Sequence, residues 1–317
     1  MSIDQASANF FQHLADQGAR PFHTMTAPEA REFFAQLREV IGEGPAVHRS
    51  EEHSVPSGSA LITLRALLPT ANPDGIIVYL HGGGWVAGAL DDFDTLGRFI
   101  ATESNCSVVL VDYRLAPEHP FPAAIDDAWA ALQWVANNQA KVAGGHSDLP
   151  LIVAGDSAGG NLAAVVARKA HDAGGPRLLQ QVLVYPVTQP DMSTPGYEDP
   201  LNQGLLGQED MAWFWESYVP EPEQRRNPDV SPLLAKDLSG LPPATIIVAE
   251  HDVVSDEGTA YAKRLEEAGV PVAYRNFDGQ VHGFFTILNA LPKSVAARDF
   301  LVTEITRAIR EDYPPVQ

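Results

Sequence analysis

Short apolar runs recur along this chain and limit its fold more than any other feature. Most of them are rich in valine, isoleucine and leucine and lack the polar alternation of a strand with one face in water. Strands that are apolar throughout are typical of sheets covered by helices on both faces. The segments between the runs have the periodicity of helices. This alternation predicts an α/β fold with a mainly parallel, doubly wound sheet.

The expected elements can be placed along the chain from these patterns. The expected strands are residues 60–69, 75–81, 107–114, 151–156, 181–186, 244–252 and 271–278. The expected helices are residues 93–104, 123–138, 161–172, 256–269 and 295–311, with a further one over residues 27–42 before the first strand.

Two segments, residues 1–44 and residues 189–219, do not fit the alternation. The first is helical in pattern but precedes every expected strand. The second is an insert dense in large apolar side chains, namely Tyr197, Met211, Trp213, Phe214, Trp215 and Tyr218. Such a cluster suits either a cover over a pocket or a helix packed on the main core, and residue type alone does not choose between them.

Charge and cysteine content narrow the class of protein. The formal net charge of -20 repels phosphate backbones and anionic lipid surfaces, so we expect neither nucleic acid nor a membrane as a partner. Cys106 is the only cysteine, which excludes an intrachain disulfide and a cysteine-based zinc cluster. The first residues lack the basic and apolar regions of a secretory signal, and no run of about 18 apolar residues occurs, so a cytoplasmic protein is expected.

The pentapeptide Gly155-Asp156-Ser157-Ala158-Gly159 lies between an expected strand and an expected helix. It matches G-x-S-x-G, in which a sharp turn strains the serine backbone and exposes the hydroxyl at the carboxyl edge of the sheet. The flanking glycines let strand and helix approach without Cβ clashes. A serine that merely caps the helix is the alternative for the pentapeptide alone, but its position between strand and helix favours a nucleophile.

A glycine loop, Gly82 to Gly84, directly follows the strand at residues 75–81. Three consecutive glycines carry an entropy cost that a simple turn does not need, but they let several N–H groups approach one oxygen. We therefore predict oxyanion donors at Gly83 and Gly84, with the N–H of Ala158 as a third. His81 and Gly82 are expected to support this loop, and Gly82 is the one of the three glycines that is not assigned as a donor.

Chain order selects the general base, because this arrangement delivers its triad in the order serine, acid, histidine. Seven of the ten histidines precede Ser157, which leaves His171, His251 and His282. His171 falls on the outer surface of the expected helix, and His251 directly precedes the expected acid. His282, in a glycine-containing loop after the last expected strand, is therefore the predicted base.

The acid is expected in the segment that follows the strand at residues 244–252. Asp252 lies just past the strand end and is the predicted partner of the base, with Glu250 in reserve. Asp256 and Glu257 follow Ser255, which can cap the next helix, so their charge is explained by the positive end of the helix dipole.

Five motifs along the chain carry a family resemblance. They are HGGGW at 81–85, YRLAPEHPFPAAIDD at 113–127, GDSAGGNLA at 155–163, SPLLA at 231–235 and VHGF at 281–284. In this order they resemble the hormone-sensitive-lipase-like branch of the α/β hydrolases, bacterial esterase family IV, and GDSAG resembles its GDSAG subgroup. The resemblance covers roughly residues 61–285.

The resemblance implies a single α/β-hydrolase domain over residues 1–317, with a cap formed by residues 1–44 and 189–219. It also implies hydrolysis of short- to medium-chain acyl esters, without a cofactor or a metal, by Ser157, Asp252 and His282. One departure is that members of the branch often have D-P-L-R-D-E around the acid, where this chain has Asp252-Val-Val-Ser-Asp-Glu257. The adjacent Glu118 and His119 suggest a metal pair in isolation, but no third ligand is near, so a structural turn that supports the site is expected.

Other functions remain compatible with these residues. A serine triad does not distinguish acyl leaving groups, so an amidase or a lactonase is the first alternative. The second is a small-molecule receptor that has lost turnover, against which an intact His282 argues. The expected partner is a small-molecule ester, and the sequence leaves open both its identity and whether the chain forms a homodimer.

Overall fold

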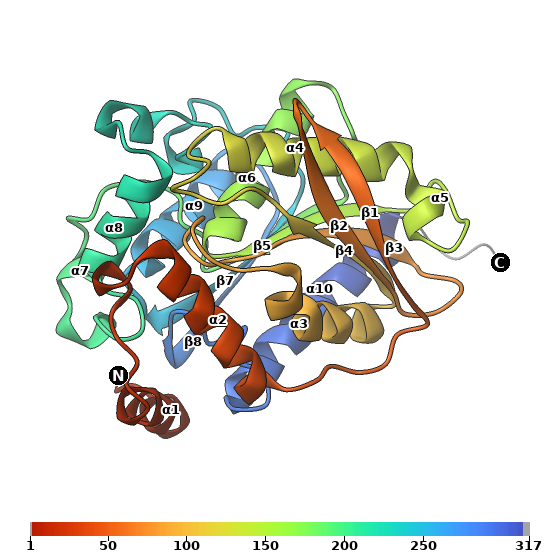
Figure 1. Cartoon of the computed structure of the whole chain (residues 1–317). Coiled ribbons are helices and arrows are strands. Elements are labelled where there is room, and N and C mark those ends of the chain that lie inside the picture. The colour runs from red at the N-terminus through yellow and green to blue at the C-terminus, as the bar shows by residue number, and fades with distance from the viewer. Residues whose placement is uncertain (1, 313–317) are drawn as a thin grey trace.

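An eight-stranded sheet forms the central layer of the structure (Figure 1). The structure is a computed structural model, and it describes residues 2–312. The strands are β1 Arg49–Ser57, β2 Ala60–Leu68, β3 Gly75–Leu80, β4 Cys106–Asp112, β5 Leu151–Asp156, β6 Gln180–Val184, β7 Ala244–His251 and β8 Val272–Val281. They lie in the order β1-β2-β4-β3-β5-β6-β7-β8, and every neighbouring pair from β4 to β8 is parallel. The predicted α/β fold with a mainly parallel sheet is confirmed.

Helices cover both faces of this sheet (Figure 1). On one face α3 (Leu90–Ser104) packs against α10 (Pro292–Asp312), and on the other α4 (Ala123–Asn137) packs against α6 (Ala158–Asp172), with α9 (Ser255–Glu267) beside β7. Strands β3, β5 and β6 are buried along their whole length, as their apolar sequences predict. Within residues 2–312, no helix combines the length and the apolar character that crossing a bilayer requires.

Strand β1 was not expected from the sequence. Its residues, RSEEHSVPS, are mostly polar, and it pairs antiparallel with β2 at the edge of the sheet. An edge strand has one unpaired side, where charged residues and a proline discourage pairing with other chains. The apolar pattern that identifies buried strands is therefore absent here.

The remaining elements lie mainly in the two segments outside the alternation and in short turns. They are α1 Gln5–Asp16, η1 Phe22–Thr24, α2 Ala27–Ile41, α5 Gln139–Val142, α7 Pro195–Glu198, η2 Pro200–Asn202, α8 Gln208–Tyr218, η3 Pro222–Arg226 and η4 Pro232–Leu234. The expected helix at residues 27–42 is thus confirmed as α2, which begins with a capping box between Thr26 and Glu29.

The N-terminal segment and the insert meet although they are far apart in sequence. The rings of Phe22 and Phe214 lie 5.4 Å apart between centroids. Asp210 Oδ1, at the start of α8, accepts the backbone N–H of His23 at 2.9 Å and lies 2.8 Å from His23 Nδ1. Because Asp210 is buried, this contact ties the two segments together.

Candidate active site

Ser157 stands at the sharp turn between β5 and α6. Its backbone has φ 55° and ψ -119°, a strained conformation for a residue with a side chain. A Cβ on Gly155 would lie 2.3 Å from the Gly159 carbonyl oxygen, and a Cβ on Gly159 would lie 1.9 Å from that of Leu80. The flanking glycines therefore permit the close approach that their positions predict.

The Ser157 hydroxyl makes no capping hydrogen bond to α6, so the structure does not realise the helix-cap alternative. It lies instead 2.8 Å from Nε2 of His282, which follows β8. The other ring nitrogen of His282, Nδ1, lies 2.7 Å from Oδ2 of Asp252, which follows β7. The structure thus brings together the three residues expected to act together, separated by 125 and 30 positions in sequence.

Asp252 is fully buried, and its second oxygen, Oδ1, accepts the N–H of Val254 at 3.0 Å. This bond holds the carboxylate in place while Oδ2 faces the imidazole. An acceptor at Nδ1 keeps the Nδ1 proton on the ring and leaves Nε2 free to accept the proton of the Ser157 hydroxyl.

The other candidate residues lie away from this group. His171 is exposed at the end of α6, as expected. Oε2 of Glu250 accepts the N–H of Gly279 at 2.7 Å, and this bond lowers the pKa of Glu250. The ring of His251 is buried, with Nε2 3.8 Å from Glu250 Oε2.

Asp256 and Glu257 have structural partners, but not through the expected cap. Helix α9 begins at Ser255 itself, and no side chain caps it, so the expected Ser255 cap is wrong. Asp256 accepts the N–H of Gly196 at 2.7 Å, and the buried Glu257 accepts those of Thr188 and Gln189 at 3.0 and 2.7 Å. The two carboxylates thus hold the insert, because all three donors lie in or next to it.

The glycine loop lies beside the serine because β3 and β5 are neighbours, with Leu80 opposite Gly155. Gly83 and Gly84 have φ values of 106° and 61°, which favour glycine. A Cβ on Gly84 would lie 2.1 Å from the Phe214 ring, so the loop passes directly beneath the insert. The glycine loop is neither helix nor strand. Among the backbone hydrogen bonds of such loops within residues 2–312, none is donated by the amide of Gly83 or Gly84. The Ala158 amide is the first of α6 and has no intrahelical acceptor.

His81 is fully enclosed behind this loop. Its ring stacks on Tyr113, 4.3 Å between centroids, and its Nδ1 lies 2.7 Å from the Gly82 carbonyl oxygen. Burial lowers the pKa of His81 to about 4, so the ring is neutral at pH 7. Within the described chain its Nε2 has no hydrogen-bond partner. These contacts place the His81 ring directly against the glycine loop.

Arg31 of α2 clamps the far end of the loop. Its Nε donates to the Val86 carbonyl oxygen at 2.9 Å, and its Nη2 donates to that of Ala116 at 3.1 Å. The same guanidinium makes a bidentate ion pair with Glu118 at 2.9 and 2.6 Å. Glu118 therefore belongs to a structural turn that supports the site, as expected. No group of three potential metal ligands occurs within the described residues.

Asp156, which precedes the serine, was not singled out as a site residue from the sequence. The carboxylate is buried, and its Oδ1 accepts the Tyr79 hydroxyl at 2.8 Å and the Gly82 N–H at 3.0 Å. Burial raises the pKa of Asp156 to about 6, and these two hydrogen bonds oppose the rise. Its place in the G-x-S-x-G turn was the one available signal.

Replacing Asp156 by asparagine is expected to stabilise the protein at pH 8 but not at pH 4. Because the pKa of about 6 lies above the ordinary 3.8, the folded state holds the proton more tightly. The stability contributed by this proton is present below pH 4 and is lost as the pH rises through 6. Two pKa units correspond to about 3 kcal/mol, an upper limit for the gain. Urea unfolding of both proteins at both pH values measures it, and an equal effect at both would contradict a buried charge.

An apolar cavity of about 80 Å³ opens beside Ser157 and His282. Its walls come from both outer segments: Phe22, Phe33, Phe34 and Leu37 from the first, Met211 and Phe214 from the second. Asp156 and His282 are the only titratable side chains in its lining other than Tyr185. The cavity therefore suits an uncharged, apolar group next to the serine.

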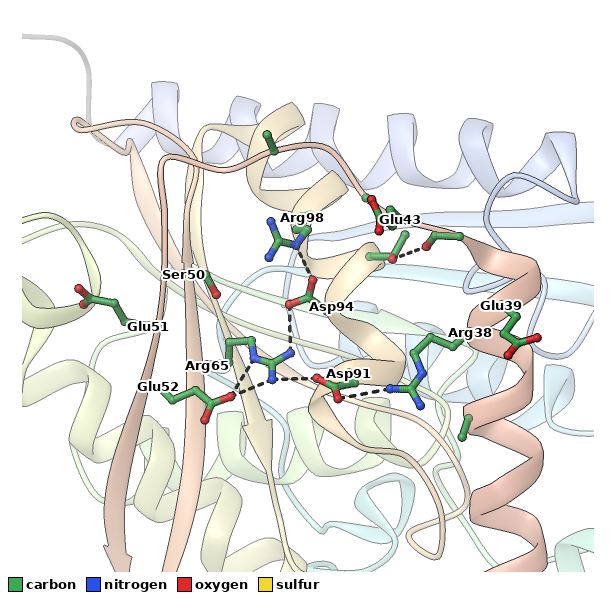
Figure 2. Close-up of a pocket in the computed structure, with 15 residues that line it drawn as sticks. Arg38, Glu39, Glu43, Ser50, Glu51, Glu52, Arg65, Asp91, Asp94 and Arg98 are labelled. Atoms are coloured by element: carbon green, nitrogen blue, oxygen red, sulfur yellow. Dashed lines mark hydrogen bonds and ion pairs between the residues drawn. The ribbon is translucent and has the colours of Figure 1, made fainter.

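A larger hollow, of about 1180 Å³, lies elsewhere, between α2, α3 and the edge strands (Figure 2). It holds no histidine and is lined by ion pairs. Arg65 lies 2.8 Å from both Glu52 and Asp91, and Asp91 also faces Arg38 of α2 at 3.3 Å (Figure 2). Arg98 pairs with Asp94 (Figure 2). Of these pairs, Arg38–Asp91 joins α2 to α3, and Arg65 joins β2 to both β1 and α3.

The chain is similar to known esterases in both sequence and structure. The sequence matches the alpha/beta hydrolase fold over residues 77–286. Carboxylesterase NlhH of Mycobacterium tuberculosis is 42% identical over 267 residues, or 82% of this chain and 83% of that protein. The ethyl acetate hydrolase of Pseudomonas putida is 35% identical over 83% of this chain and 85% of that protein. A solved hyperthermophilic esterase from Pyrobaculum calidifontis is 37% identical, with a TM-score of 0.90 over 98% of this chain and 100% of that one.

Proposed function

Because the chain belongs to the hormone-sensitive-lipase-like branch of the α/β-hydrolase family and is a carboxylic ester hydrolase, we propose that it cleaves short- to medium-chain acyl esters with a Ser157-His282-Asp252 triad. One observation carries this proposal. The hydrogen-bonded series from Asp252 through His282 to the Ser157 hydroxyl ends at an apolar cavity next to free amides.

In the first half of the reaction, Ser157 Oγ attacks the ester carbonyl carbon while His282 Nε2 takes the hydroxyl proton. Asp252 stabilises the imidazolium that forms. The carbonyl oxygen becomes an oxyanion and accepts hydrogen bonds from the amides of Gly83, Gly84 and Ala158. His282 then returns the proton to the departing alkoxide, which leaves an acyl-enzyme and an alcohol.

In the second half, water replaces the alcohol. His282 takes a proton from water as its oxygen attacks the acyl-enzyme carbonyl, and the same amides stabilise the second oxyanion. Collapse of this intermediate breaks the bond to Ser157 Oγ, which regains a proton from His282. The products are a carboxylic acid and the free enzyme, and the proposed reaction needs no cofactor.

The two outer segments, residues 1–44 and 189–219, would form the cap of this site. They supply the six apolar cavity walls named above, and the His23–Asp210 contact joins them. With no Lys or Arg in the cavity lining, an acyl group with a negative charge would lack a partner there. The favoured substrates are therefore neutral esters, and the limited volume favours short acyl chains.

The test is a series of nitrophenyl esters from acetyl to long acyl chains, with wild type and Ser157→Ala compared throughout. We expect turnover by the wild type that falls steeply with chain length, and none above background by Ser157→Ala. Equal rates for both proteins would remove the proposal. A matched nitroanilide and a lactone test the amidase and lactonase alternatives, because the triad itself does not select the leaving group.

Phe33→Ala is expected to shift the preference toward longer acyl chains. Phe33 and Leu37 line both the 80 Å³ cavity and a groove of about 490 Å³ between α1 and α2, so they form the partition between them. Removing the ring joins the two spaces. The ratio of kcat/KM for nitrophenyl decanoate to that for nitrophenyl butyrate should rise at least about tenfold, since each accommodated methylene is worth a factor of this order.

The matched control for this change is Val40→Ala, because Val40 lines the outer groove and is half exposed. This variant should keep the wild-type ratio. If Phe33→Ala leaves the ratio unchanged while its melting temperature shows it to be folded, the partition does not limit chain length.

A further inference from the structure

The start of the glycine loop is held by a carboxylate that belongs to the serine turn. Asp156 Oδ1 accepts the Gly82 N–H at 3.0 Å, across 74 positions of sequence. Gly82 is therefore not a free donor, in contrast to Gly83 and Gly84 beyond it. This bond connects the residue before the nucleophile directly to the residue before the first proposed oxyanion donor.

The fit between this carboxylate and the loop is close. A Cβ on Gly82 would lie 2.3 Å from Asp156 Oδ2, so the carboxylate occupies the space that a side chain at position 82 would need. The first glycine of the loop is thus explained by contact with Asp156. Its φ is not among the positive values, unlike those of Gly83 and Gly84, so backbone conformation does not explain it.

Asp156 is itself fixed from a third direction. The Tyr79 hydroxyl donates to the same oxygen at 2.8 Å, from the strand that leads into the glycine loop. Both Tyr79 and Asp156 are buried, so water does not compete for these bonds. Asp156 Oδ1 is therefore bonded both to the glycine loop and to the strand that leads into it, while its backbone belongs to the serine turn.

We propose that Asp156 is a positioning residue for ester hydrolysis, which holds the glycine loop at the distance from Ser157 where the Gly83 and Gly84 amides meet the oxyanion. This role rests on the oxyanion hole of the proposed function. It requires a hydrogen-bond acceptor at Oδ1 rather than a negative charge. An asparagine oxygen can accept the same two bonds, whereas alanine leaves the Gly82 amide and the Tyr79 hydroxyl without a partner.

The experiment compares wild type with Asp156→Ala and Asp156→Asn on nitrophenyl butyrate. Asp156→Ala should lower kcat by about 100-fold, the usual effect of losing an oxyanion donor, while KM changes by less than about threefold. Asp156→Asn should restore kcat to within about fivefold of wild type. A trifluoromethyl ketone, which forms a tetrahedral adduct with serine, should bind about 100-fold more weakly to the alanine variant only.

Asp127→Ala is the matched control. Asp127 is also a fully buried aspartate, and it accepts hydrogen bonds from Arg114 at 2.7 to 2.9 Å, outside the cavity lining. This variant should lose stability while the kcat of the folded protein stays near wild type. Melting temperatures identify the folded fraction in each case.

Three results would overturn the inference. The first is a wild-type kcat in Asp156→Ala, and the second is an equal loss of kcat in Asp156→Ala and Asp156→Asn. The third is a rise in the KM for substrate as large as the loss of affinity for the ketone. Failure of the proposed function gives a different pattern, because Ser157→Ala would then keep its turnover whatever the Asp156 variants do.

Discussion

His282→Ala is expected to lower kcat on nitrophenyl esters by a factor on the order of 10⁶ and to abolish covalent labelling of Ser157 by an organophosphate. The imidazole is the group within hydrogen-bonding distance of the serine hydroxyl, at 2.8 Å, that can accept its proton. Without it the hydroxyl remains protonated and is a weak nucleophile. Steady-state kinetics and the mass of the protein after treatment measure the two effects.

His171→Ala is the matched control, since His171 is an exposed histidine on α6 that contacts none of the three residues. It should keep wild-type rates and wild-type labelling. Robust labelling of His282→Ala would show that another group activates the serine. Asp252→Asn should lower kcat by about 10⁴-fold, an effect between those of His171→Ala and His282→Ala. The imidazole remains in this variant, but its favoured tautomer is lost.

Gly159→Ala is expected to prevent folding or to lower the free energy of unfolding by roughly 4 kcal/mol or more. The new Cβ would lie 1.9 Å from the Leu80 carbonyl oxygen and 2.5 Å from that of His81. Both atoms are backbone, and Leu80 belongs to a strand paired on both sides, so its carbonyl cannot move away without breaking the sheet. Urea unfolding and the yield of folded protein measure the change.

Gly204→Ala gives the comparison, because a Cβ on Gly204 meets no atom within 4 Å and its φ is not positive. Its unfolding free energy should stay within about 0.5 kcal/mol of wild type. If Gly159→Ala were as stable as Gly204→Ala, the close approach of helix and strand at the serine turn would be wrong.

Much of this molecule could be predicted because its signals are local. Most strands of the parallel part of the sheet are apolar runs, although β8 is more mixed, and the helices that cover the sheet have their own periodicity. Their positions therefore follow from neighbouring residues. The serine, histidine and acid could be chosen because the order of elements determines which loops reach the same edge of the sheet. Asp252 was preferred over Glu250 on this ground, and the structure places Asp252 beside the imidazole.

The features that were missed depend on contacts between distant segments. Ser255 has the residue type of a helix cap, yet α9 starts at Ser255 itself, and the neighbouring carboxylates bind the insert instead. Strand β1 carries no apolar pattern because its stability comes from its partner β2. Nothing in the sequence distinguishes Arg31 from the other arginines, because its contact depends on the packing of α2 against the loop that ends at Val86.

By itself, the sequence determined the α/β architecture and which residues stand at the carboxyl edge of the sheet, because periodicity and glycine turns act over a few residues. Only the tertiary structure decided how the edge is enclosed, which side chains line the cavity, and that Asp156 holds the glycine loop. These depend on distances between segments 50 or more positions apart, such as the 74 between Gly82 and Asp156, and side-chain packing sets them.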